Sequence, residues 1–228
     1  MALQTFDLTL DQRFAALDDA KAAFVTKVYG TLALSLIVTT LACGFTVANI
    51  DTMRPFAKVA GFITLGMVIL SIFVRLKGVF GWAFLWTFVT LIGISLGPLI
   101  NAYVSSALGL ETLTYALGLT ATIFVGLTAY VRFTGKDFSW MGGFLWMATL
   151  GLIITSIAFF FFPSPNLYYW YSWVGALIFS GWILYDTSQV TRQYFQDNNV
   201  VGAVLNLYLD IVNLFLYLLS ILSGRSRD

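Results

Sequence analysis

The sequence contains no histidine, a single cysteine and few charged residues, although it is 228 residues long. The absence of histidine excludes histidine-ligated zinc or haem, Ser-His and Cys-His nucleophiles, and a histidine pH switch. Cys43 alone forms neither an internal disulfide nor a multi-cysteine metal site. Charged residues make up 10% of the chain, against about a quarter in an ordinary soluble domain. So little charge cannot cover a water-facing surface, and a soluble globular fold is excluded.

What the sequence does contain is apolar length: 59% of its residues are hydrophobic and its mean hydropathy is +0.86. A membrane helix needs about 20 predominantly apolar residues. Seven runs of this kind occur, separated by short turns such as Asp51–Pro55. They lie at 24–49, 58–76, 79–100, 112–131, 140–162, 168–187 and 200–222. We therefore predict an all-α polytopic membrane protein, a single seven-helix bundle over 24–222. Residues 1–23 form an acidic tail, soluble or lying as a surface helix, and residues 223–228 a short carboxyl-terminal tail.

Lysine and arginine predict the orientation, because cytoplasmic loops of membrane proteins carry an excess of both. With seven crossings, eight basic residues fall on the side of the amino terminus and four on the other, which predicts a cytoplasmic amino terminus. If the segment 200–222 instead enters the membrane and returns, Arg225 and Arg227 change sides and the asymmetry grows. A full crossing is the preferred prediction, because this segment is long enough and has no helix breaker after Gly202.

Glycine and aromatic residues in these segments have structural explanations. Gly93 and Gly97 form a small-xxx-small pair, which predicts close packing of the third segment against a neighbouring helix. Tyrosines and tryptophans cluster near segment ends, as in residues 168–173, and this distribution is typical of an interfacial aromatic belt.

Two aspartates fall inside apolar segments: Asp186 at the end of the sixth and Asp210 near the middle of the seventh. A carboxylate at mid-helix costs about 2.5–3.5 kcal/mol on insertion scales, so each must face the bundle interior or water and needs a partner or a proton. Asn206, Asp210 and Asn213 share one face of the last helix, and Gln189 follows Asp186 at i+3. Because a short loop joins the two helices, we expect antiparallel neighbours whose carboxyl groups face each other.

Protons and a hard cation would compete for such a pair. Two carboxyl groups within hydrogen-bonding distance cannot both ionise cheaply, so they tend to share a proton. When both are ionised they present the oxygen ligands that calcium prefers, and the side-chain carbonyls of Asn206 and Asn213 are available to add to them. Calcium takes about six to eight oxygens, so water or backbone must complete the shell. The sequence therefore predicts transient occupancy by calcium as a permeant ion, with no resident cofactor.

Each of these residues also has a purely structural interpretation. Asp186 is near enough to a helix end to cap or anchor the sixth helix. In the corresponding interpretation of Asp210, its carboxyl group forms a hydrogen bond that only stabilises the bundle. Arg75, at the end of the second segment, is placed either to extend to the cytoplasmic interface or to act as a counter-ion. As a counter-ion, its guanidinium would pair with Asp186 in one state and release it in another.

Two motifs resemble the paired signature of the Bax inhibitor-1 family, also called transmembrane Bax inhibitor motif proteins. The first is Gly-Trp-Ile-Leu-Tyr-Asp-Thr-Ser-Gln-Val at 181–190, similar to the family's Tyr-Asp on the sixth helix. The second is Leu-Asn-Leu-Tyr-Leu-Asp-Ile-Val-Asn-Leu-Phe at 205–215, similar to the family's Tyr-Leu-Asp and Asn-Leu-Phe on the last helix. The seven-segment layout and the short acidic tail extend the resemblance over essentially the whole chain.

The resemblance implies six helices around a central last helix and activity as a pH-sensitive calcium leak channel. It implies that Asp186 and Asp210 are the proton-sensitive pair. It also implies that Arg75, which precedes Gly-Trp-Ala-Phe at 81–84, latches the first aspartate. The compact form, without the charged carboxyl-terminal extension of eukaryotic members, is similar to bacterial members and implies the plasma (inner) membrane. The implied partners are the lipid bilayer, calcium ions and protons.

Three other function classes compete with a channel: an enzyme, a regulatory protein and a secondary transporter. The transporter is disfavoured, because the sequence shows no paired broken helices. Two membrane aspartates also suggest an intramembrane aspartyl protease, but such enzymes need Gly-x-Gly-Asp around the second carboxylate. Leu207-Tyr208-Leu209 precedes Asp210 here, so we expect no catalysis. The main alternative is a regulatory protein that modulates a membrane-bound protease through direct contacts. Some bacterial relatives of the family resemble such modulators. Residues 1–20 are then the expected contact segment. A net charge of +1 without a basic block argues against a nucleic-acid partner.

Overall fold

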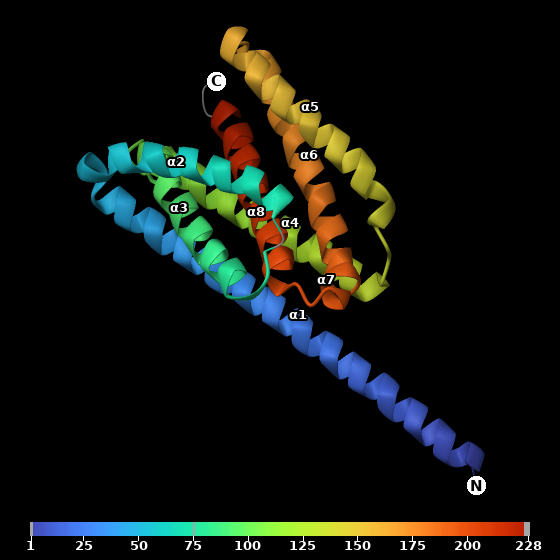
Figure 1. Ribbon diagram of the computed structural model, residues 1–228. Helices are drawn as coiled ribbons and strands as arrows, with labels where there is room; N and C mark the ends of the chain where they lie inside the picture. Colours follow the sequence, from blue (N-terminus) through green and yellow to red (C-terminus); the bar gives the residue numbers. More distant parts are fainter. Residues whose placement is uncertain (1, 75, 226–228) are drawn as a thin grey trace.

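The computed structural model describes residues 2–74 and 76–225, and within these ranges every regular element is helical (Figure 1). The all-α prediction is therefore confirmed for this part of the chain. The elements in chain order are α1 (Ala2–Ala48), α2 (Ile50–Phe73), α3 (Gly78–Val104), α4 (Gly109–Thr134), the 3-10 turn η1 (Ser139–Met141), α5 (Gly142–Phe161), α6 (Pro165–Val190), α7 (Gln193–Gln196) and α8 (Val200–Arg225).

Each of the seven predicted apolar runs overlaps one long helix, but two boundaries differ. Helix α1 continues without a break through the predicted boundary at residue 23, and its first part extends well beyond the bundle (Figure 1). Burial nevertheless begins close to that boundary, because residues 12–23 are exposed and Phe24 is buried. The predicted turn Asp51–Pro55 is wrong: it lies inside α2, and Asn49 alone separates α1 from α2. Pro55 is tolerated near the start of α2, where its missing N–H removes a single helical hydrogen bond.

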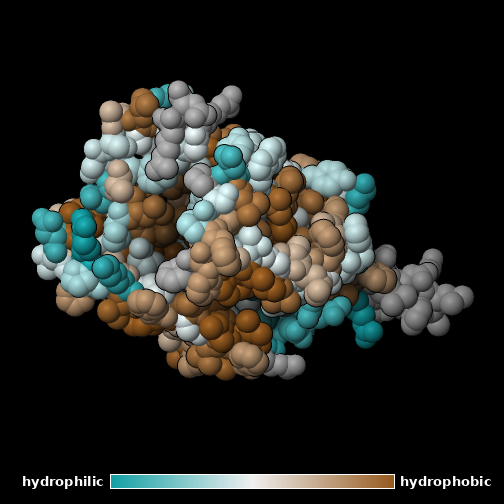
Figure 2. Space-filling view, turned by 90° about the horizontal axis from the view of Figure 1, so that it is seen from above, coloured by the Kyte–Doolittle hydropathy of each residue, from teal (hydrophilic) through white to brown (hydrophobic). Residues whose placement is uncertain are grey.

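Among the residues that the structure describes, six helices are long and apolar enough to cross a membrane, which makes the chain a multi-pass membrane protein. They are α1 (from Gln12), α2, α3, α4, α8 and the stretch Ser139–Phe159 that contains α5. Apolar side chains cover much of the outer surface, as the view from above shows in brown (Figure 2). Helix α6 has the length of a span but not the hydropathy, because tyrosines, tryptophans and a serine fill residues 168–173. The sequence predicted seven spans, and these criteria give six.

Helix α8 is the most buried of the six: 67% of its most apolar stretch is covered, against 33% or less in each of the others. Its Tyr208 side chain is completely buried and forms a hydrogen bond with the Thr39 hydroxyl of α1 at 2.6 Å. Thr39 Oγ1 lies in turn 3.1 Å from the Val89 carbonyl oxygen of α3. These three side-chain and backbone groups tie α1, α3 and α8 together inside the hydrophobic core.

Helices α1 and α3 pack closely because α3 has glycine at the contact. A Cβ atom added to Gly93 would collide with the Thr39 carbonyl oxygen and the Ala42 side chain. A Cβ atom on Gly97 would collide with the side chain of Thr46. The close packing predicted from the Gly93–Gly97 pair is therefore confirmed, and α1 is its partner.

Candidate functional site

Asp186 and Asp210 meet inside the bundle. Asp186 lies four residues before the end of α6, and Asp210 lies near the middle of α8, which packs against α6. Their side chains are 2% and 5% exposed, and the two carboxyl groups are within hydrogen-bonding reach of each other. A short connection makes α6 and α8 neighbours, so the two acids lie on helices that pack against each other. The i, i+4 spacing of Asn206 and Asp210 places both of these side chains on one face of α8.

A tyrosine and an asparagine support this carboxyl pair. The Tyr194 hydroxyl, on the four-residue helix α7, donates a hydrogen bond to Asp186 Oδ1 at 3.2 Å. Asn206 Nδ2 of α8 donates to the same hydroxyl oxygen. Burial, followed by the negative charge of Asp186, raises the pKa of Tyr194, so its hydroxyl remains a donor at every physiological pH. Sequence reasoning missed Tyr194, because it belongs to the connection between helices, where the helical period gives no information.

One oxygen of the pair has no partner. Asp210 Oδ2 is buried and makes no hydrogen bond within residues 2–74 and 76–225. In the same ranges the only salt bridge is Arg192–Asp137, so neither Asp186 nor Asp210 has a basic partner there. No group of three or more Asp, Glu, Cys or His side chains in the described residues is placed to hold a metal. A proton or a transient cation is therefore what this oxygen is suited to accept.

Two other predicted site residues, Asn213 and Gln189, form their hydrogen bonds with groups outside the pair. Asn213 Nδ2 donates to the Leu209 carbonyl oxygen in its own helix at 2.8 Å. Gln189 is buried, and its Nε2 donates to Ser139 Oγ at 2.6 Å. Arg75, the predicted latch, lies outside the described residues.

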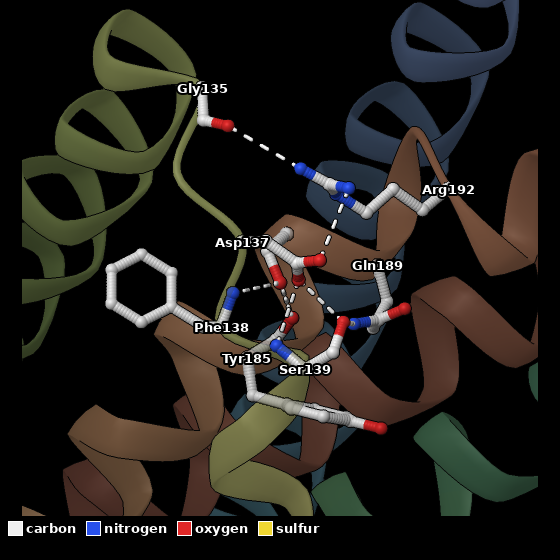
Figure 3. Close-up of polar contacts among 8 residues, drawn as sticks. Gly135, Asp137, Phe138, Ser139, Tyr185, Gln189 and Arg192 are labelled. Atoms are coloured by element: carbon white, nitrogen blue, oxygen red, sulfur yellow. Dashed lines mark hydrogen bonds and ion pairs between the residues drawn. The ribbon is translucent and has the colours of Figure 1, made fainter.

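Gln189 belongs to a second polar cluster, formed where the α4–α5 connection meets the end of α6 (Figure 3). Asp137 Oδ1 accepts hydrogen bonds from the Ser139 hydroxyl and backbone N–H, and these bonds lower the pKa of Asp137 below its ordinary value. Asp137 Oδ2 forms a salt bridge with Arg192 Nη1 at 3.2 Å, and Arg192 Nη2 donates to the Gly135 carbonyl oxygen. The cluster joins the two connections at one end of the bundle.

A large cavity opens at the opposite end, which Figure 2 faces. Its volume is about 1220 Å³, and it lies between the ends of α3 and α8 and the α5–α6 connection. The hydroxyls of Tyr103 and Ser223 form a hydrogen bond at its wall, 2.5 Å apart, and those of Ser172 and Ser220 form another at 2.8 Å. Asn213, Tyr217 and Ser220 follow Asp210 at helical spacing, so polar side chains recur along α8 between the carboxyl pair and this cavity.

Residues 21–227 match the family model described as "inhibitor of apoptosis-promoting Bax1". The chain is 34% identical over 214 residues to Bax inhibitor 1 of Schizosaccharomyces pombe, which covers 89% of this chain and 76% of that protein. It is 38% identical over 143 residues to the modulator of FtsH protease YccA of Escherichia coli, with 63% and 64% covered. It is 42% identical over 139 residues to an uncharacterised membrane protein of Vibrio cholerae, with 60% and 61% covered. The matched regions thus span less than two thirds of the YccA and Vibrio proteins.

Proposed function

The chain belongs to the Bax inhibitor-1 family, and from this premise we propose that it is a pH-sensitive calcium leak channel of the inner membrane. The observation that carries the proposal is the contact between the buried carboxyl groups of Asp186 and Asp210, with one oxygen left unpartnered. When a proton is shared, the pair is closed to cations. When the proton leaves, the pair presents anionic oxygens to a divalent ion.

The proposed path uses the polar groups along α8. Calcium passes between the end of the bundle near Tyr194, the carboxyl pair, and the cavity at the opposite end. Two carboxylates and one or two amide oxygens are too few to hold calcium tightly, and this favours passage over storage. The proposal assigns no catalytic step to either aspartate, and it requires no resident cofactor or metal.

We extend the proposal to the membrane arrangement. Helix α6 is the seventh span: its 26 residues extend about 39 Å, and its aromatic first half suits the headgroup depth. Helix α8, which contacts α1, α3, α4 and α6, is then the central helix of the bundle. The excess of lysine and arginine on one side makes the amino terminus cytoplasmic. Arg75 would latch Asp186 from that side, as the family resemblance implies.

Calcium flux into vesicles loaded with a calcium dye tests the channel. Wild type is expected to conduct calcium at a rate that changes with pH between pH 5 and 8. In Asp210→Asn, the pH-dependent part of the calcium flux is expected to be at least about tenfold smaller. Such a loss corresponds to one charged contact with the ion. Asp19→Asn, an exposed aspartate of α1, is the matched control and is expected to behave as wild type. Unchanged flux and pH dependence in Asp210→Asn would disprove the carboxyl-pair mechanism.

The similarity to the modulator of FtsH protease YccA favours a second candidate, regulation of a membrane-bound protease by direct contact. The part of α1 that extends beyond the bundle, in which residues 12–23 are exposed, is the surface available for such a contact (Figure 1). Deletion of residues 2–20 is expected to abolish copurification with a membrane-bound protease and to leave calcium flux intact. If the deletion abolishes flux and preserves copurification, the regulatory candidate is wrong.

A further inference from the structure

A second cavity, of about 320 Å³, lies at the end of the bundle where α1 leaves it. Its walls come from three helices and two connections: α1, the end of α4, the α4–α5 connection, the end of α6 and the α6–α7 connection. Four basic residues and one acidic residue line it, namely Lys21, Arg132, Lys136, Arg192 and Asp18. The chain as a whole has nearly balanced charge, so this cavity concentrates a large share of its positive charge.

Two of the four basic side chains interact with another side chain, and the other two have no acidic partner within the described ranges. Arg192 pairs with Asp137, and Lys136 Nζ donates to the Tyr130 hydroxyl at 2.9 Å. Lys21 and Arg132 have no acidic partner among the residues that the structure describes. Asp18 is the only acid in the lining, so the cavity retains an excess of positive charge that a bound anion would neutralise.

Thr187 also lines this cavity, but its hydroxyl is turned away from it. Thr187 Oγ1 is buried, as are the hydroxyls of Tyr29 on α1 and Thr128 on α4. The Tyr29 hydroxyl lies within hydrogen-bonding reach of both threonines, so the three groups serve one another as partners. The groups that a bound anion would meet are therefore the charged side chains of the lining.

We infer that this cavity binds a phosphate group. Arginine and lysine together supply the charge, and the planar guanidinium of Arg132 matches the geometry of phosphate oxygens. The volume accommodates one phosphate group and its ester substituent but not a lipid acyl chain, and Val25 and Val131 form an apolar margin to the site. A phospholipid headgroup and a free phosphate share this chemistry, and the experiment below separates them.

Binding is measured on the full chain in nanodiscs of phosphatidylcholine. One arm adds phosphatidylglycerol to the discs, and the other adds inorganic phosphate at constant ionic strength. Each is titrated against the thermal midpoint of the protein. The variant K21Q/R132Q is expected to weaken binding by at least about tenfold, as removal of charged hydrogen bonds does. The matched control R54Q/K58Q removes two exposed charges from the start of α2, at the other end of α1, and is expected to bind as wild type.

Each outcome decides the inference. Stabilisation by phosphatidylglycerol alone identifies a lipid headgroup, and stabilisation by inorganic phosphate alone or by both identifies a soluble phosphate source. No stabilisation by either anion overturns the site, and so does equal weakening in the two double variants. If K21Q/R132Q does not fold, K21E replaces it, because Lys21 is exposed on α1. Its binding must fall by a larger factor at low salt than at high salt. These readouts do not use calcium flux, so they are independent of the proposed channel.

Discussion

Tyr194 is the residue that connects the carboxyl pair to the surface of the molecule. Its hydroxyl accepts a hydrogen bond from Asn206 and donates one to Asp186, and its backbone belongs to the exposed connection between α6 and α8. A donor to a carboxyl oxygen stabilises the ionised form of that group. In the proposed channel, Tyr194 therefore favours the calcium-accepting state of the pair.

Tyr194→Phe is expected to shift the pH midpoint of calcium flux upward by about one unit. The substitution removes one hydrogen bond to a charged group, worth about 1.5 kcal/mol, and one pH unit corresponds to a similar free energy. The measurement is dye-detected flux between pH 5 and 8. Tyr115→Phe, on the exposed face of α4, is the control. A midpoint that moves downward, or moves equally in both variants, would contradict the role given to Tyr194.

Asp137 makes a pH-dependent contribution to stability outside the membrane. Its pKa is lower in the folded protein than the ordinary value of 3.8, because Ser139 donates two hydrogen bonds to it. The contribution is therefore fully present above pH 3.8 and is lost as the pH falls through the lower, folded value. Asp137→Asn is expected to lower the thermal midpoint at pH 7.

The difference between Asp137→Asn and wild type should shrink as the pH falls below 3.8, because the wild-type carboxyl then takes up a proton as well. Thermal unfolding in detergent, measured from pH 7 to pH 3, checks this. Asp19→Asn, on the exposed part of α1, is the control. A difference that stays constant with pH would show that Asp137 acts through packing and not through its charge.

The sequence was sufficient to predict that Asp186 and Asp210 are buried, because an acid inside an apolar run has few alternatives to an inward position. Asn206 followed from the same helical face. Gln189 shares the i+3 spacing from Asp186, yet its side chain turns to Ser139, since a residue 50 positions away offers it a partner that periodicity does not reveal. Asn213 has a different reason: the backbone carbonyl four residues earlier in its own helix is a local acceptor for its side chain.

At the scale of the element, the contact between α1 and α3 depends on a glycine. Gly93→Ala is expected to lower the free energy of unfolding by about 1–3 kcal/mol, because the added methyl group collides with a backbone carbonyl that cannot rotate away. Gly118→Ala is the matched control: it lies in α4 with open space around it and is expected to be neutral or stabilising by about 1 kcal/mol. Thermal unfolding of both variants checks the contrast, and destabilisation of equal size in the two would contradict the close-packing account.

Element positions were predictable because the required apolar length of a span is nearly constant. The exact ends were not. Residues 2–23 continue α1 as a helix, although their charge predicted a separate tail, because charge determines where a segment lies and not whether it is helical. The reverse holds for α6, whose aromatic residues lower its hydropathy without shortening the helix.

At the scale of the whole molecule, a crossing of α8 places the two ends of the chain on opposite sides of the membrane. Helix α8 is continuous over Val200–Arg225, with no break at which it turns back. Cys43 is the only native cysteine, so Cys43→Ser provides a background for single reporters. In it, Leu17→Cys is expected to react with an impermeant thiol reagent from the cytoplasmic side only, and Gly224→Cys from the outer side only. Labelling of both from one side would show that the last helix re-enters.

The two acids lie on consecutive long helices, and this has a consequence for the insertion of the chain into the membrane. Asp186 and Asp210 lie on consecutive long helices, joined by α7, so each carboxyl group finds its partner within one helical hairpin. During synthesis neither acid needs to enter lipid alone, a step that costs about 2.5–3.5 kcal/mol for an isolated carboxylate. The final hairpin can therefore insert as one unit after α1 to α5 are in place. A chain that ended at residue 199 would lack α8, and Asp186 would then be without its partner carboxyl group.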